Sequence, residues 1–535
     1  MLGGLRLLPA HLRIMQSSPS AASTYDSWTR EELIARLRQI DTTIHRQPAH
    51  RRSPTRPPKQ FDYAAQPRRK IALKFTYDGS HYSGLEFQKT PSPLPTVESV
   101  LFDALVRTRL VDPKGGFTGC GWEKCGRTDR GVSAAGQVVS FWVRSALPEF
   151  LRPSDQDEQN KQDAASDMHD ANENVEAVYD VDGALEGASD GPGLEGDFQL
   201  MADWDEPRNT SQSSVPPKPC TELHYISSLN NVLPPTIRII AWSPVSDEFS
   251  ARFSCRYRHY KYFFDPKGLD VSAMRDATQC FVGEHDFRNF CKIDASKQLT
   301  SFVRNVLSAE INVVNDSVYV LDLVGASFLY NQVRHIMAIL FLVGTGMERP
   351  LVVNALFNTD AANPLPAAKG GEAAPPVVPS KPGYQIADPL PLMLWECGYD
   401  ETAVRWRADA QDDETAVDGQ RSYSNNLIQM LQSLHQRSVI HATLDAHFLR
   451  AASRYHSAPP QYFPVSHPRS SPILPGTVLR FPIGAGALRQ EGNYVPLLQR
   501  PRAATAEEIN EKWKANKDAK TASRRIDEPP EDGDE

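Results

Sequence analysis

The chain has 535 residues, 40% of them hydrophobic, and a formal net charge of −8 at pH 7. This length allows two domains with a substantial core, while the apolar run at residues 338–343 is too short to span a membrane. The seven cysteines are dispersed without a Cys-x-x-Cys pair, which argues against a zinc site and favours a reducing intracellular compartment.

Residues 1–67 are predicted to form an N-terminal tether. Within it, residues 28–44 carry leucine and isoleucine at helical spacing, which predicts one helix. A basic, proline-rich stretch follows at residues 51–70, and it either binds RNA phosphates or remains a solvated linker. The first 25 residues contain two arginines and no acidic residue, which is typical of a mitochondrial transit segment but equally of a disordered start.

The ordered part of the chain is predicted to begin at residue 71. Residues 71–77 and 137–143 are rich in β-branched and aromatic side chains, which predicts two strands. Between them, Thr96 is a suitable N-cap for a helix that carries Leu101 and Leu105 on one face.

An acidic insert then interrupts the pattern. Residues 154–207 hold 17 Asp and Glu against one Lys, a net charge of −16. Because the whole chain carries −8, the rest of it carries +8, and a basic body is suited to a polyanionic partner. The insert is also poor in apolar residues, so we expect it to be disordered; an acidic interaction segment is the alternative.

The body resumes near residue 220. Alternating and β-branched patterns predict four strands, at 237–242, 257–264, 303–314 and 318–324. Helical spacing predicts helices at 223–232 and 327–343, with a loop or short helix at 281–292. Residues 361–382 are rich in Pro, Gly and Ala and are predicted to be a linker or inserted loop, and residues 384–400 a last ordered piece.

Strands and helices on both sides of the insert predict an α+β fold with two α+β layers, one on each side, which we call the two lobes. The predicted organisation comprises a tether at 1–67, a first lobe at 68–153 with 208–266, the acidic insert at 154–207, a second lobe at 267–400 that includes the insertion at 361–382, and a partly helical extension at 401–535. Within the extension, residues 424–453 are predicted to be helical and the charged residues 500–535 to be disordered.

One short turn concentrates charge around a single carboxylate. Residues 125–134 have the sequence CGRTDRGVSA, in which Asp129 lies between Arg127 and Arg130. We expect these arginines to keep the carboxylate ionised by lowering its pKa. The simpler interpretation is an ordinary Asp-x-Gly turn in which the carboxylate caps its own backbone, and spacing alone favours it.

The run at 127–134 resembles the signature of the TruA-type tRNA pseudouridine synthases, although Arg130 stands where that family usually has lysine. Further segments resemble the family's other motifs in the same order, at 77–84, 249–262, 283–287 and 327–335. The resemblance covers roughly residues 71–345, with a weaker extension at 384–397. It implies two lobes with mixed or antiparallel sheets and an active site in the cleft between them.

The resemblance also implies roles for individual residues. Asp129 would be the catalytic residue, either as a nucleophile or as the base of a glycal route, and Arg334 its active-site partner. The implied substrate contacts are Tyr260 against the target base, Leu329 or Phe328 as an apolar wall, Arg127 in base extrusion, and Arg252 and Lys124 on phosphates. Without the resemblance, a snorkelling Arg334 and a core Tyr260 are the simpler interpretations.

Pseudouridine formation moves the bond of one uracil from nitrogen to carbon without redox change or group transfer, so we expect no cofactor. The implied partner is tRNA. Segments 84–88 and 328–334 most resemble the eukaryotic branch that acts on anticodon-stem positions 38 and 39. The alternatives are a sister synthase for other tRNA or small nuclear RNA uridines, and a catalytically silent RNA-binding protein. We expect the protein in nucleus and cytoplasm, with a mitochondrial fraction if the transit interpretation holds; monomer and dimer both stay open.

Overall fold

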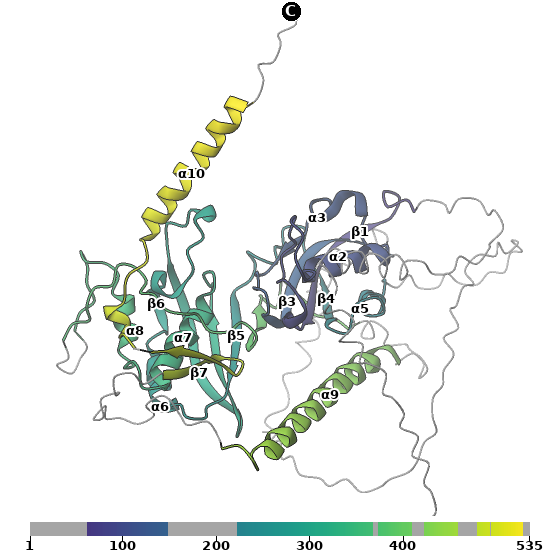
Figure 1. Cartoon of the computed structure of the whole chain (residues 1–535). Coiled ribbons are helices and arrows are strands. Elements are labelled where there is room, and N and C mark those ends of the chain that lie inside the picture. Colours follow the sequence, from purple (N-terminus) through teal and green to yellow (C-terminus); the bar gives the residue numbers. More distant parts are fainter. Residues whose placement is uncertain are drawn as a thin grey trace, which may run out of the picture. The chain divides into compact units, whose positions relative to one another are not determined.

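The computed structural model describes residues 61–147, 222–367, 373–408, 422–457, 479–492 and 494–527 (Figure 1). The predicted tether helix at 28–44 and the acidic insert at 154–207 lie outside the described residues.

A mixed sheet of nine strands runs through the described part of the chain. Its strands are β1 (Arg68–Tyr77), β2 (Glu123–Lys124), β3 (Ser133–Arg144), β4 (Ile237–Pro244), β5 (Tyr257–Phe264), β6 (Gly283–Asp286), β7 (Val303–Asn315), β8 (Val318–Gly325) and β9 (Leu392–Gly398). The order is β4-β1-β3-β9-β5-β8-β7-β6, with β2 paired to β3. All pairs are antiparallel except β3–β9, a parallel link of only two residue pairs, Ser133 with Met393 and Ala134 with Leu394.

Helices flank this sheet and extend beyond it (Figure 1). They are α2 (Val97–Arg107), α3 (Gly116–Gly119), α5 (Tyr225–Asn230), α6 (Val271–Gln279), α7 (Gln332–Gly344), α8 (Val352–Phe357), α9 (Ser422–Ala452) and α10 (Ala506–Asp527), and a separate hairpin consists of β10 (Leu479–Gly484) and β11 (Ala487–Glu491). Thr96 is the N-cap of α2, as predicted. The side chains of Thr96 and Ser99 each accept from the other's backbone N–H at 3.2 Å. None of the described helices is long and apolar enough to cross a membrane.

Two hydrophobic clusters pack against the sheet. One joins β1, β3 and β4 to α2 and α5, and it includes Phe75, Leu101 and Trp242. The other joins β5, β7 and β8 to α6, α7 and α8, and it includes Tyr262 and Phe341. Helix α7 is buried along almost its whole length, which explains why its sequence is apolar on every face.

Two predicted segments are wrong in their type or extent. Residues 281–292 do contain a short 3-10 helix at Arg288–Phe290, within the predicted loop or short helix, but they also contain the edge strand β6. The polar sequence Gly-Glu-His-Asp does not predict this strand, which forms by pairing with β7. The helix predicted at 327–343 begins only at Gln332, because Asn331 is left-handed with φ 61° and the preceding residues form a loop.

The C-terminal predictions also need correction. Residues 500–535 were predicted to be disordered, yet α10 occupies 506–527. The stretch 361–382 is more than a linker, because Val378 is fully buried and its carbonyl accepts from the amide of Asn289 at 2.7 Å. Helices α6 and α8 and the β10–β11 hairpin were not predicted; they are short, and tertiary packing stabilises them.

Candidate active site

Asp129 lies in the turn between β2 and β3, which we call the Asp129 turn (residues 125–132). The turn is closed by the backbone N–H of Val132, which donates to the carbonyl of Asp129 at 3.1 Å. Gly84 lies directly against it with φ 98°, and a Cβ there would come within 3.1 Å of the Thr128 carbonyl oxygen. Only glycine combines that φ with so close an approach, so Gly84 fixes where the turn can lie.

The end of β1 supports the same turn from the other side. The hydroxyls of Tyr77 and Thr128 hydrogen-bond at 2.5 Å, and the backbone N–H of Gly79 donates to Ser133 Oγ at 3.0 Å. Leu85 N–H donates to the Thr128 carbonyl at 3.2 Å. The segment 77–85 therefore holds the turn on both sides of Asp129.

Arg334 extends from the first turn of α7 toward Asp129. Its Nη1 lies 3.7 Å from Asp129 Oδ2, with side chains 13% and 28% exposed, so the predicted pairing of these two residues is confirmed as an ion-pair contact. Its Nε donates to the carbonyl of Ala387 at 2.8 Å. A cation in the first turn of a helix opposes the helix dipole, and a nearby carboxylate offsets that cost.

The electrostatic state of Asp129 differs from the sequence-based prediction. Burial raises the pKa of its carboxyl group, while Arg334, then Lys292 and Arg127, lower it, and the balance is a raised pKa. The prediction that the arginines dominate was wrong, because the depth of a turn cannot be known from its sequence.

Tyr260 lies on β5 and packs against both hydrophobic clusters. Its ring meets Phe328 edge-to-face with centroids 5.0 Å apart, and burial raises the pKa of its phenol. Leu329, next to Phe328, is 7% exposed. Tyr260 and Phe328 thus form a pair of packed aromatic rings, and the hydroxyl of Tyr260 is neutral.

The sequence model of a family described as tRNA pseudouridine synthase matches residues 277–400. A tRNA pseudouridine(38/39) synthase of Saccharomyces cerevisiae is 33% identical over 415 residues, which cover 74% of this chain and 76% of the relative. The chain belongs to the TruA-type family of tRNA pseudouridine synthases. The human protein of the same name is also 33% identical, over 71% of this chain and 66% of its own length.

As a tRNA pseudouridine synthase, the chain is an isomerase. An archaeal tRNA pseudouridine synthase A, from Methanothrix thermoacetophila, is 29% identical over 340 residues, which cover 64% of this chain and 86% of the relative. The segment matched by the family model contains Arg334, whereas the Asp129 turn precedes it.

The other residues predicted to contact tRNA differ in their exposure and in their partners within the protein. Arg127 is half exposed and bonds Glu86 at 2.8 Å. Arg252 is exposed, with its guanidinium 5.1 Å from the ring centre of Phe253. Lys124, predicted to contact phosphate, donates to both oxygens of the buried Glu98, at 2.9 and 3.0 Å, and also pairs with Glu86 at 3.2 Å.

Sequence reasoning missed Arg258, which joins three loops of the synthase. Its Nη2 donates to the carbonyls of Cys125 at 3.1 Å and Arg252 at 3.0 Å, and its Nη1 to Ala326 at 2.8 Å. These carbonyls belong to the Asp129 turn, the loop that precedes β5 and the loop that precedes α7. The motif at 249–262 contains Arg258, but nothing in its spacing indicates a structural bridge.

Lys292 is a second residue that the sequence did not single out. It is among the cations that lower the Asp129 pKa, and its ammonium lies 5.5 Å from the ring centre of Tyr330. Among the described residues, no group of three or more His, Cys, Asp or Glu side chains is arranged to hold a metal ion.

Proposed function

We propose that this synthase converts uridine to pseudouridine at positions 38 and 39 of tRNA, with Asp129 as its catalytic residue. The observation that carries the catalytic assignment is the half-buried Asp129–Arg334 pair, in which an acid with a raised pKa faces a guanidinium at 3.7 Å. The printed names of the yeast, bovine and human relatives support the choice of positions.

The reaction breaks the bond between uracil N1 and ribose C1′, turns the base and joins C5 to C1′; one proton leaves C5 and one is gained at N1. An ionised Asp129 can act as nucleophile at C1′ or as the base that starts a glycal route, and both need the carboxylate form. Arg334 opposes the effect of burial on the Asp129 pKa, so it keeps part of that form available in a drier environment.

The target base would lie against Tyr260 and Leu329, and Arg127 would help to extrude it. A flipped base must leave its stack at a cost of a few kcal/mol, and a neutral phenol with an apolar neighbour offers it a replacement surface. The two hydrophobic clusters correspond to the two lobes of the family fold, and we expect tRNA to bind across the β3–β9 link beside the Asp129 turn.

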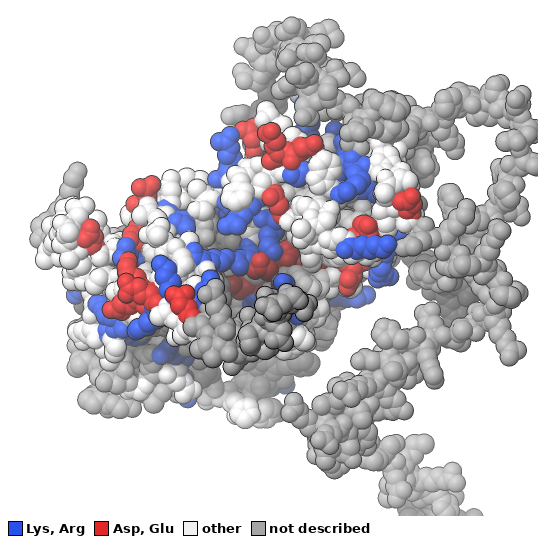
Figure 2. Space-filling view, turned by 90° about the horizontal axis from the view of Figure 1, so that it is seen from above, with Lys and Arg blue, Asp and Glu red and all other residues white. Residues whose placement is uncertain are grey.

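Two cation–aromatic pairs are suited to the RNA around that base. Phe253 is 78% exposed beside Arg252, and Tyr330 is 45% exposed beside Lys292. Exposed rings stack on bases without reading sequence, and the neighbouring cations attract phosphates. Lys and Arg side chains also gather near the middle of the face in Figure 2, with acidic ones interspersed.

The test compares two aspartates that each face a cation. Asp129→Asn should bind tRNA normally and form no pseudouridine at positions 38 and 39 when the product is mapped by base-specific chemical modification and reverse transcription. Asp322→Asn is the matched control, because Asp322 pairs with Lys261 at 2.6 Å and has no role in the proposed chemistry. Product formation by Asp129→Asn would overturn the assignment, and product only at other uridines would favour a sister synthase.

A further inference from the structure

The C-terminal extension, a name used from here on for residues 479–492 and 494–503, contributes Phe481 and Leu497 to the second hydrophobic cluster, although it follows the segment that the family model matches. Phe481 is 5% exposed and Leu497 is fully buried. Glu348 Oε1 accepts from the hydroxyl of Tyr494 at 2.6 Å and from the N–H of Leu497 at 2.7 Å. The extension is therefore anchored to the body and is not a loose tail.

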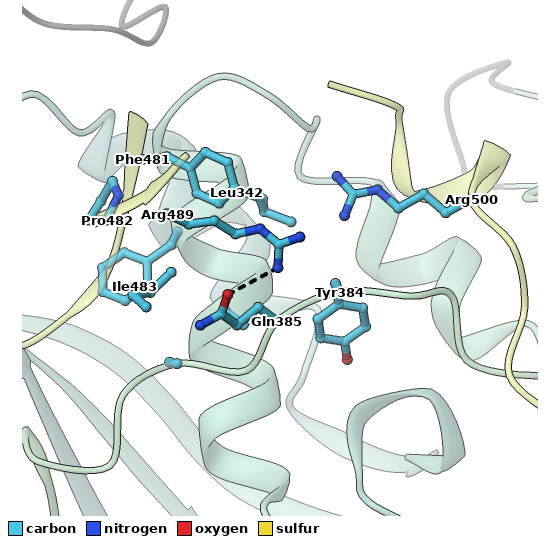
Figure 3. A pocket seen from close by; sticks show the side chains of 11 residues that line it. Leu342, Tyr384, Gln385, Phe481, Pro482, Ile483, Arg489 and Arg500 are labelled. Atoms are coloured by element: carbon cyan, nitrogen blue, oxygen red, sulfur yellow. Dashed lines mark hydrogen bonds between the residues drawn. The ribbon is translucent and has the colours of Figure 1, made fainter. Parts of the chain in front are cut away.

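The extension follows one particular stretch of the body, the 381–388 segment. Three backbone bonds join them, from Ala503 N–H to Lys381 at 2.8 Å, from Gly383 N–H to Pro501 at 3.1 Å, and from Asp388 N–H to Ile483 at 2.7 Å. Figure 3 shows Arg489 reaching Gln385, a bond of 3.1 Å. A small open pocket lies at this contact, and both the extension and the 381–388 segment contribute side chains to its lining.

The same segment holds Arg334. The Nε of Arg334 donates to the carbonyl of Ala387 at 2.8 Å, and the N–H of Ala387 donates back to the carbonyl of Arg334 at 3.2 Å. The buried hydroxyl of Tyr262 lies 2.9 Å from the carbonyl of Asp388 and 3.4 Å from that of Ile483. One hydroxyl thus links the extension to the segment that orients Arg334.

We propose that the C-terminal extension is a positioning element that holds Arg334 in place through Asp388 and Ala387. The inference rests on the proposed role of the Asp129–Arg334 pair. Arginine has a long and flexible side chain, and a catalytic contact requires it to stay within a fraction of an ångström of one geometry. The bond to Ala387 fixes one edge of the guanidinium and leaves Nη1 toward Asp129.

The experiment compares two isosteric substitutions in the full-length protein. Tyr262→Phe removes the hydroxyl that links Ile483 and Asp388. The control, Tyr225→Phe, removes an equally buried hydroxyl in the first of the two hydrophobic clusters, where it donates to the carbonyl of Arg144 at 2.9 Å. We expect Tyr262→Phe to lower the single-turnover rate constant about tenfold, as a small displacement of a catalytic group does, with little change in the Kd for tRNA. Tyr225→Phe should leave the rate constant within about twofold, because the bond that it removes lies in the other hydrophobic cluster, away from the 381–388 segment.

A second measurement separates positioning from a general loss of structure. The cations that face Asp129 are Arg334, Lys292 and Arg127. If Arg334 moves away, the acid limb of the rate–pH profile should shift to higher pH in Tyr262→Phe and not in Tyr225→Phe. Equal effects of the two substitutions, or an unshifted limb, would overturn the inference. Activity of Asp129→Asn would instead overturn the proposed function, so the two failures are distinguishable.

Discussion

Asp129 and Arg334 meet at one contact, but the protein holds them in different ways. Asp129 is fixed by its own turn and by residues 77–85, both within the first part of the ordered chain. Arg334 is fixed by Ala387, and that residue's segment is joined in turn to the C-terminal extension. One side of the pair is therefore specified locally, and the other depends on segments that are far apart in the sequence.

Removing Arg334 should give the largest effect. Arg334→Leu leaves a half-buried carboxylate without its nearest cation, and we expect the rate constant at neutral pH to fall about a hundredfold, equivalent to roughly 3 kcal/mol. Arg334→Lys should recover only part of it, since lysine cannot bond Ala387 and face Asp129 with one planar group. The acid limb should move to higher pH in both. Full activity of Arg334→Leu would show that the pair is not needed.

Arg258 bonds both the Asp129 turn and the loop that precedes α7, so its loss should loosen the support of both Asp129 and Arg334. Arg258→Met removes three charge-assisted bonds to backbone carbonyls, and we expect the free energy of unfolding to fall by about 3 kcal/mol. Activity at a temperature where the variant is folded should also fall. Arg256→Met is the control, because Arg256 is 71% exposed and pairs with Asp400 at the surface. Denaturant unfolding that showed equal losses would contradict the bridging role.

The way in which the neighbouring chain fixes the Asp129 turn can be tested at Gly84. Gly84→Ala places a Cβ against the Thr128 carbonyl at a positive φ, and we expect about 2 kcal/mol of destabilisation with reduced activity. Gly116→Ala also has a positive φ, but its Cβ would meet nothing within 4 Å. Gly116→Ala should therefore lose only the stability that the unfavourable φ costs, and it should keep its activity. Similar activity losses in both variants would mean that the approach of Gly84 to the turn is unimportant.

The smallest expected effect is on stability. Because the folded-state pKa of Asp129 is raised, the ionised carboxylate costs stability, fully so above the folded pKa. Asp129→Asn should therefore raise the Tm slightly at pH 7, and the advantage should shrink as the pH falls through the raised pKa toward the ordinary value. A Tm clearly below that of the unmodified protein at pH 7 would indicate that the carboxylate is stabilising.

Sequence reasoning succeeded where the structure is specified locally. The strand predicted at 257–264 is β5 with the same bounds, and Thr96 caps α2 as expected. The contact of Asp129 with Arg334 was predicted only through the family resemblance, because the two residues belong to different parts of the chain. The predicted domain boundaries and residue roles remain predictions.

The errors share a cause: a local sequence pattern does not indicate how deeply a residue is buried or which distant residues it contacts. The pKa of Asp129 depends on how deep its turn lies, and the strand β6 depends on its pairing with β7. The hairpin that supports Asp388 has no distinctive periodicity, so nothing in its sequence indicates that it belongs to the body.

The two-pair link between β3 and β9 has a consequence for the order of folding. Strand β9 fits between β3 and β5, and Met393 pairs with Ser133, so the strand that completes the sheet leaves the ribosome long after its neighbours. Contacts between such distant residues form late, because closing a long loop costs entropy before it is rewarded. Until then β3 and β5 each have an unpaired edge beside the site, and such edges are prone to misassociation. The nascent chain would therefore expose both strand edges until β9 has been made, which is before the C-terminal extension can position Arg334.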